Sequence, residues 1–262
     1  GVAEVPLIEE RLSARFAFNV AHSKGYIENV NPAISDRSNI DRKAGRLTLG
    51  YRDENDLKAT LRVFHNGSDA KAIGVINTGT APGGLNALGV DPRINPYTGQ
   101  RMTRHQMATD RDGDLEVRGS GLYLNVQKDL GPVSITSITS HLRGRFLNNV
   151  DADGTTRNLL HIDFRAKNKE TSQDLRIATN GSGAFNVIAG LYYFRDDIDI
   201  DTTYTIFGGP PVLPILNQSF DQRRTSYAAY IDGTLELSDM FTAYGGLRYT
   251  DDKGRLSNFQ VT

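Results

Sequence analysis

Residues 225–250 read TSYAAYIDGTLELSDMFTAYGGLRYT, and apolar and polar side chains alternate along most of this stretch. Successive side chains of a β-strand point to opposite faces of a sheet, so the alternation predicts strands at 225–237 and 241–250. Ser and Asp at 238–240 favour a tight turn between them. The apolar face of the first strand carries Tyr227, Ala229, Ile231, Leu235 and Leu237.

This hairpin fixes which residues of the two strands face each other. With the turn at 238–240, we expect Tyr230 opposite Arg248 and Asp232 opposite Gly246. Arg248 then lies one diagonal step from Asp232, which is within reach of a long side chain. The sequence therefore predicts an ion pair between Arg248 and Asp232 on the polar face of the hairpin.

The same period of two recurs along the rest of the chain. Residues 11–20 (RLSARFAFNV) and 120–128 alternate cleanly. Less regular strands are predicted at 43–52, 57–66, 132–146, 172–180 and 184–196. The total is about nine strands, and no segment of useful length has the pattern of a helix.

The connections between these strands alternate in length. Short turns rich in Asp, Asn or Gly are predicted at 53–56, 128–131, 180–183 and 238–240. Long connections are predicted at about 25–41, 67–113, 147–171 and 197–220. A compact soluble domain has mostly short connections, whereas a membrane barrel has short turns at one end and long loops at the other.

The predicted fold class is therefore all-β: a segment of an antiparallel transmembrane β-barrel with alternating short turns and long loops. Bacterial single-chain barrels have even numbers of strands, and plugged transporters with long loops have about 22. We expect residues 1–262 to form a partial β-barrel, with about nine strands of a larger barrel of about 22 strands.

The composition of the chain and its lack of known motifs argue against several classes of function. The chain has 30 Lys and Arg against 31 Asp and Glu, a formal net charge of −1. It has no basic run, which argues against nucleic acid as a partner. It contains no Cys, which excludes disulfides, thiolate metal sites and cysteine nucleophiles. No catalytic or phosphate-binding motif stands out, so we predict neither an enzyme nor a cofactor.

Four segments, in order, give the chain a family resemblance. Residues 5–30 resemble the early barrel strands of TonB-dependent outer-membrane receptors, where a "PL…L..R" stretch leads to a "GY..N" loop entry. SQDLRIAT at 172–179 resembles a recurring strand start of that family, with Asp174 replacing the commoner Glu. GLYYFRD at 190–196 resembles the next strand, and residues 230–254 resemble a hairpin that ends in "G-x-R-Y-T-x-D-x-K".

The resemblance implies nutrient uptake at the outer membrane of a Gram-negative bacterium. It implies three partners: outer-membrane lipid, a small-molecule or chelate substrate, and the TonB energy-transducing complex. The substrate would be a ferric siderophore, a vitamin or a glycan. TonB would act through a plug domain, and we find neither that domain nor a TonB box within residues 1–262. A passive outer-membrane porin is the main alternative, and a soluble β-rich adhesin or binding module is a further one.

The longest connection, 67–113, contains a local basic set in a nearly neutral chain. Arg93, Arg101, Arg104 and His105 all fall in it. Such a set attracts anionic chelates or phosphorylated cargo. We therefore predict that Arg101, Arg104 and His105 bind substrate.

Two acidic segments match parts of a calcium-binding pattern. In DRDGDLE at 110–116, the Gly is not at the sixth position that an EF-hand loop requires. NVDADG at 149–154 matches the first half of such a loop, but its twelfth position is Leu160 and not Glu. No two of the five His have the spacing of a zinc motif. The sequence therefore predicts no metal site.

Overall fold

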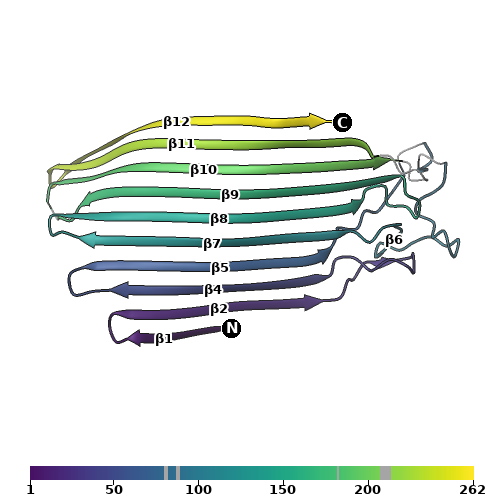
Figure 1. Cartoon of the computed structure of the whole chain (residues 1–262), viewed down its shortest axis with the longest axis horizontal. Helices are drawn as coiled ribbons and strands as arrows, with labels where there is room; N and C mark the ends of the chain where they lie inside the picture. The colour runs from purple at the N-terminus through teal and green to yellow at the C-terminus, as the bar shows by residue number, and fades with distance from the viewer. Residues whose placement is uncertain (80–81, 87–88, 182, 207–213) are drawn as a thin grey trace.

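The computed structural model describes residues 1–79, 82–86, 89–181, 183–206 and 214–262, and most of these form one antiparallel β-sheet (Figure 1). Ten strands lie side by side in the order β1-β2-β4-β5-β7-β8-β9-β10-β11-β12. Two short strands, β3 and β6, form a separate parallel pair within the long connections. The described residues include no apolar helix of membrane-crossing length.

The elements have the following bounds. The large sheet contains β1 (Val2–Ile8), β2 (Leu12–Ser23), β4 (Ile40–Arg52), β5 (Leu57–Lys71), β7 (Asp114–Asp129), β8 (Val133–Asp151), β9 (Leu160–Thr179), β10 (Phe185–Ile206), β11 (Pro214–Ser238) and β12 (Phe241–Val261). The small pair consists of β3 (Glu28–Asn29) and β6 (Gln106–Met107).

The prediction of an antiparallel all-β chain is confirmed, with ten strands in the large sheet where the sequence indicated about nine. The additional strand is β1, which pairs with β2 and has an irregularity after Pro6. Proline lacks the amide hydrogen that a central strand needs, so it is confined to edge strands and bulges. The alternation breaks at Pro6, which explains why the pattern did not reveal this edge strand.

Several strands extend well beyond their predicted ends toward the long connections. β8 continues to Asp151 and β9 begins at Leu160, so most of the predicted connection 147–171 is paired strand. In β9 the apolar residues Leu160, Ile162 and Phe164 alternate with polar ones, but they fall on the face opposite to that of Leu175 and Ile177. The hydrophobic period therefore changes phase along the strand although the backbone pairing continues. The predicted segments 180–183 and 197–220 include residues 182 and 207–213, which lie outside the described residues.

The tight turns lie at the end of the sheet opposite the long connections (Figure 1). In the turn between β4 and β5, the Asp53 carboxylate accepts the Leu57 amide at 2.8 Å, and Asp56 has a φ of 60°. In the turn between β7 and β8, the Asp129 carboxylate accepts the amide of Gly131 at 2.8 Å, and Gly131 has a φ of 88°. Asp and Gly tolerate positive φ, and the Asp carboxylates accept these local hydrogen bonds. For this reason the Asp- and Gly-rich composition of these segments predicted the turns.

The strand register gathers apolar side chains on one face of the sheet, which we call the apolar face. Ile231 lies opposite Ala189 of β10 and Leu247 of β12. The predicted pairings of Tyr230 with Arg248 and of Asp232 with Gly246 are confirmed, and these residues belong to the opposite, polar face. Exposed members of the apolar face are Val5, Phe16, Leu47, Val63, Leu122, Ile135, Leu175, Leu191, Ile231 and Leu247.

The long connections lie together at one end of the sheet (Figure 1), and several of their residues are buried. The described parts of the connections 24–39 and 72–113 pack together around the β3–β6 pair, and we call them the loop cap. Met107 of β6 is 0% exposed. The buried residues of the described part of the loop cap include Asn29, Arg37, Ala72, Asn86, Met107, Ala108 and Thr109.

Candidate functional site

Arg37 is the central polar anchor of the loop cap, with a side chain only 2% exposed. Its guanidinium donates hydrogen bonds to the carbonyl oxygens of Ser35 and Arg111 at 2.8 and 2.6 Å. It also donates to Asp112 Oδ1 at 3.1 Å. The planar guanidinium offers five N–H donors, so one side chain ties both connections together.

Asp112 connects Arg37 to Lys71 at the end of β5. Its carboxylate accepts the amide and the hydroxyl of Ser35 at 3.2 and 3.0 Å and lies 3.4 Å from Lys71 Nζ. Burial raises the pKa of Asp112, but hydrogen bonds from Arg37 and Ser35 outweigh burial and hold the pKa below its usual value. Asp112 is therefore an anion that joins the two connections to the sheet.

A second buried contact joins the same two connections. Asn29 Nδ2 donates to Thr109 Oγ1 at 2.6 Å, and the Thr109 amide donates to Asn29 Oδ1 at 3.3 Å. Asn31 Nδ2 donates to the Thr109 carbonyl oxygen at 3.0 Å. Buried polar groups stabilise a structure when their hydrogen bonds are satisfied, so these contacts support one fixed arrangement of the cap.

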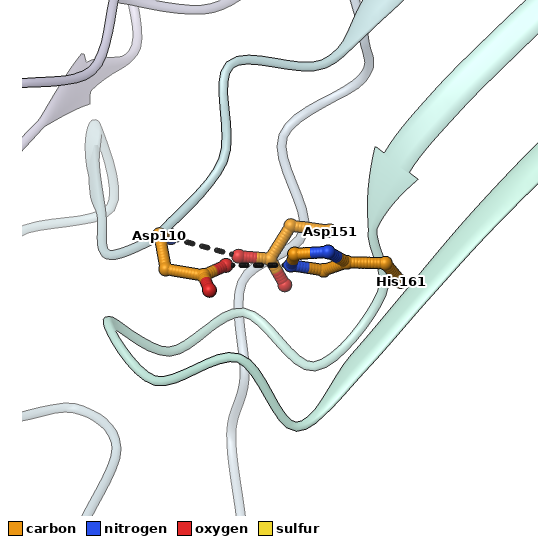
Figure 2. Close-up of side chains that lie close together, drawn as sticks. All are labelled: Asp110, Asp151 and His161. Atoms are coloured by element: carbon orange, nitrogen blue, oxygen red, sulfur yellow. Dashed lines mark hydrogen bonds and ion pairs between the residues drawn. The ribbon is translucent and has the colours of Figure 1, made fainter. Parts of the chain in front are cut away.

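Three titratable side chains meet where the loop cap reaches β8 and β9 (Figure 2). Asp110 belongs to the cap, Asp151 ends β8, and His161 lies near the start of β9. His161 Nε2 donates to Asp110 Oδ1 at 2.8 Å, and the Asp110 amide donates to Asp151 Oδ2 at 3.0 Å. Asp151 and His161 are direct partners in the antiparallel register.

The protonation of this cluster depends on burial and on the neighbouring charges. Asp151 is 3% exposed, and its burial, with the Asp110 and Asp153 carboxylates nearby, raises its pKa to about 7. The hydrogen bond with Asp110 raises the pKa of His161. Burial also raises the pKa of Asp110, but the hydrogen bonds with His161 and Asp151 outweigh it and lower the pKa.

This cluster could hold a cation or act as a clasp. Each side chain offers one ligand atom, and these atoms lie within 4.8 Å of one another. Two carboxylates and one imidazole suit a divalent transition metal. The hydrogen bonds described above already join the three residues, so the geometry favours a clasp that fastens the loop cap to the sheet. The sequence prediction of no metal site stays a prediction.

We expect the clasp to loosen as the pH rises from about 6 to about 8. Asp151 has a raised pKa, so its stabilising contribution is present when it is protonated and declines as the pH approaches about 7. His161 contributes stability below its unfolded pKa of about 6.5, and this is lost as the pH rises through its higher folded pKa. The Asp110 amide should exchange roughly tenfold faster at the higher pH after correction for intrinsic exchange, because one pKa unit equals about 1.4 kcal/mol.

His161→Gln is the matching variant because glutamine cannot carry the imidazolium charge. In this variant the pH dependence of Asp110 exchange should shrink, whereas exchange of the Ile231 amide within the sheet should not change. Equal corrected exchange of Asp110 at both pH values in the unaltered protein would contradict the clasp.

The residues predicted to bind substrate lie exposed on the loop cap. Arg104 Nε donates to His105 Nε2 at 3.1 Å, so these two side chains are in contact. Arg93 and, more weakly, Arg101 lower the pKa of Asp91 to about 2, and Arg93 is paired with Asp91 at 2.7 Å. Within the described residues, Arg101 and Arg104 form no ion pair, and no hydrogen bond joins Arg101 to the other two.

A second polar cluster lies on the polar face of β9 to β12. Tyr230 Oη donates to Asp174 Oδ1 at 3.1 Å. The Arg248 guanidinium carbon lies 5.7 Å from the ring centre of Tyr192 and 5.7 Å from that of Tyr230. Both distances are within the range of a cation–π interaction.

The predicted ion pair between Arg248 and Asp232 does not form in the described structure. Arg248 Nε instead donates to Thr250 Oγ1 at 3.2 Å. Tyr230 lies directly opposite Arg248 in the register, so its ring is closer than the diagonal position of Asp232. The register was predicted correctly, but the aromatic contact replaced the ionic one.

Sequence reasoning missed most of the residues that hold the loop cap. Arg37 and Thr109 lie in irregular connections without a periodic pattern. Asp151 and His161 had a usable signal, because an Asp-Gly pair at 153–154 marks a turn. The Asp153 carboxylate does close that connection, accepting the Leu160 amide at 2.8 Å.

The fold of this chain is similar to that of several solved structures. No protein-family model matches the sequence, and no curated protein matches it significantly. The structure is similar to the ferric yersiniabactin uptake receptor FyuA from Yersinia pestis, with a TM-score of 0.73, 17% identity and 97% of this chain covered. It is also similar to the ferric-catecholate import receptor Fiu from E. coli, with a TM-score of 0.65, 14% identity and 97% covered.

A third similar structure is the siderophore receptor PiuA from Acinetobacter baumannii, with a TM-score of 0.65, 12% identity and all of this chain covered. The match covers 36% of the FyuA chain, 42% of the Fiu chain and 41% of the PiuA chain. The fold is therefore that of the barrel portion of TonB-dependent receptors, and the chain spans well under half the length of these receptors.

Proposed function

We propose that this chain is part of the barrel of a TonB-dependent uptake receptor in the outer membrane of a Gram-negative bacterium. The observation that supports this most is the similarity of almost the whole chain to siderophore receptors. On this proposal, residues 1–262 supply ten consecutive strands of a larger barrel. The outer edges of β1 and β12 would pair with strands outside this chain, and a plug domain, also outside it, would engage TonB.

The length of the apolar face supports a membrane position. A tilted strand needs about 9–11 residues to cross a bilayer. On the apolar face, the continuous apolar stretches of β10, β11 and β12 fall within 185–193, 227–237 and 241–249, which match that length. Beyond these stretches the same face becomes charged, beginning with Arg195 on β10 and Asp251 on β12. We propose that the apolar face contacts lipid and the polar face lines the lumen.

The loop cap is the proposed external part of the receptor. It lies at the long-loop end, which faces the medium in barrels of this kind. Arg101 and Arg104 are exposed and have no ion-pair partner among the described residues, so their charges remain available to an anion. We propose that the substrate is a small anionic chelate, such as a ferric siderophore, and that Arg101, Arg104 and His105 attract it.

Replacing Arg101, Arg104 and His105 together with Gln is expected to weaken binding of an anionic ferric siderophore at least tenfold. The physical reason is the loss of unpaired positive charge from the exposed surface of the loop cap. Binding to the full-length receptor on cells is measured by quenching of a fluorescent label, with surface expression checked by antibody.

A control variant carries Arg11→Gln, Arg52→Gln and Lys128→Gln at the tight-turn end, and it should bind normally. Unchanged affinity in the loop variant would remove these residues from the site. The absence of any saturable siderophore binding by the unaltered receptor would favour a passive porin instead.

A further inference from the structure

The clasp formed by Asp110, Asp151 and His161 carries more carboxylate charge than its neighbours balance. Its members are well buried: Asp151 is 3% exposed, and the side chains of Asp110 and His161 are 15% and 12% exposed. Neither carboxylate forms an ion pair with a lysine or an arginine in the described part of the chain. Buried carboxylates are normally paired with cations or bound to metal ions, and one imidazolium can balance only one of these two.

The charged residues next to the clasp are already engaged elsewhere. Arg111 follows the aspartate of the cap in the chain, but its guanidinium is paired with Asp163 Oδ1 at 2.5 Å. Asp153 is the third carboxylate nearby, and it accepts the backbone amide of Leu160 at 2.8 Å. The three residues of the clasp are therefore the groups left to share a cation.

Backbone amides hold the Asp151 carboxylate in a fixed orientation. Its Oδ1 accepts the amides of Asp153 and Gly154, both at 3.1 Å, and its Oδ2 accepts the Asp110 amide at 3.0 Å. A carboxylate has about four lone-pair sites, so Oδ2 can still bind a further partner. Hydrogen bonds of this kind orient the ligands in metal sites.

A buried oxygen without a hydrogen-bond partner lies next to the clasp. Asn149 Oδ1 is buried and accepts no hydrogen bond within the described residues. Asn149 lies two residues before Asp151 on β8, so the two side chains are on the same side of the sheet. A Cβ atom on Gly113 would clash with the backbone carbonyl oxygen of Asn149, so the loop cap packs closely here. A buried acceptor of this kind is a position where an ion or a water is expected.

We propose that Asp110, Asp151 and His161 bind one Zn²⁺ ion, which fastens the loop cap to the ends of β8 and β9. Their ligand atoms lie within 4.8 Å of one another, so small side-chain shifts bring them around one ion. Zinc takes imidazole nitrogen together with carboxylate oxygen, whereas Ca²⁺ takes oxygen ligands. Metal ligands are deprotonated, so zinc replaces the proton that His161 Nε2 shares with Asp110 Oδ1, and this proton leaves to water. The ligands come from three separate segments, so no local spacing in the sequence could reveal them.

The test uses the full-length protein in detergent, stripped with EDTA and dialysed at pH 8 against Zn²⁺ or Ca²⁺. We expect the unaltered protein to bind one more Zn²⁺ than His161→Gln, with no such difference for Ca²⁺. A ligand that binds only the closed clasp stabilises it by RT ln(1 + [L]/Kd), so free Zn²⁺ at ten times Kd should slow Asp110 amide exchange about tenfold relative to EDTA. His141→Gln is the matched control and should behave like the unaltered protein, because His141 contacts the Thr171 hydroxyl at 2.9 Å and no carboxylate.

Equal zinc stoichiometry in the unaltered protein and in His161→Gln would overturn the zinc site. Asp110 exchange that zinc does not slow, or that Ca²⁺ slows equally, would overturn it as well. Asp151→Asn keeps the imidazole and should also lose one Zn²⁺, and exchange of the Ile231 amide shows whether the variants keep the folded sheet. If a variant unfolds, the exchange measurement on the unaltered protein decides alone. A receptor that binds siderophore but lacks this zinc refutes only the zinc site, whereas one that binds the zinc but no siderophore refutes only the proposed function.

Discussion

Replacing Arg37 with Met is expected to destabilise the loop cap by about 3 kcal/mol, the low end of the cost of breaking a buried ion pair. Methionine keeps most of the side-chain length but removes every donor. The carbonyl oxygens of Ser35 and Arg111 then lose the partner that binds them at 2.8 and 2.6 Å. Asp112 keeps Lys71 and Ser35 as partners, so the remaining charge is partly compensated.

Hydrogen exchange of the cap amides is the appropriate measurement. The amides of Glu28 and Val30 donate to the carbonyl oxygens of His105 and Met107, both at 2.8 Å, so they report on whether the cap is closed. A loss of about 3 kcal/mol corresponds to roughly a hundredfold faster exchange through cap opening. Amides within β10 and β11 should keep their protection, because the large sheet does not depend on Arg37.

Arg11→Met is the matched control for the same chemical change at an exposed position. Arg11 forms an ion pair with Glu54 in which the two side chains are 52% and 80% exposed. Exposed pairs of this kind contribute less than about 1 kcal/mol. If Arg37→Met had as small an effect on cap exchange as Arg11→Met, the cap would not be a cooperative unit anchored by Arg37.

The strands next to the tight turns were predictable because one face is apolar and the other polar. The hairpin of β11 and β12 shows this most clearly, and even its register followed from the turn at 238–240. The outer halves of β8 and β9 were not predictable in the same way. Arg165 and Lys167 lie on the same face of β9 as Leu175 and Ile177, so the polar and apolar faces exchange along this strand and the pattern does not continue in phase. Backbone pairing with the neighbouring strands identifies the outer half as strand.

The residues of the candidate site also differ in how far the sequence could predict them. The exposed basic residues of the loop cap could be selected from charge alone, because solvated charge needs no particular neighbour. The buried contacts depend on residues distant in sequence, such as Arg37 with Asp112 and Asn29 with Thr109. No fixed spacing in the sequence marks either contact, so the sequence pattern could not predict which residues contact each other.

Replacing Ile231 with Arg is expected to destabilise the protein in lipid vesicles by about 2–4 kcal/mol, the cost of an arginine facing lipid near the bilayer midplane. Ile231 lies near the middle of the apolar stretch 227–237 and is 50% exposed on the apolar face. Its neighbours across the strands are Ala189 and Leu247, which offer no hydrogen bond to a guanidinium from their side chains. Urea unfolding of the full-length protein in vesicles measures the loss.

Two further variants on β11 distinguish a surface that faces lipid from a surface that is packed against protein. Thr234→Arg places the same side chain on the polar face, so it should cost little because that face is proposed to be hydrated. Leu237→Arg lies on the apolar face beside the tight turn, so it should cost only about 0–1 kcal/mol near the membrane interface. A soluble module that buried this face against protein would show no such depth dependence. Equal costs at Ile231, Thr234 and Leu237 would therefore rule out the membrane orientation on which the proposed uptake function rests.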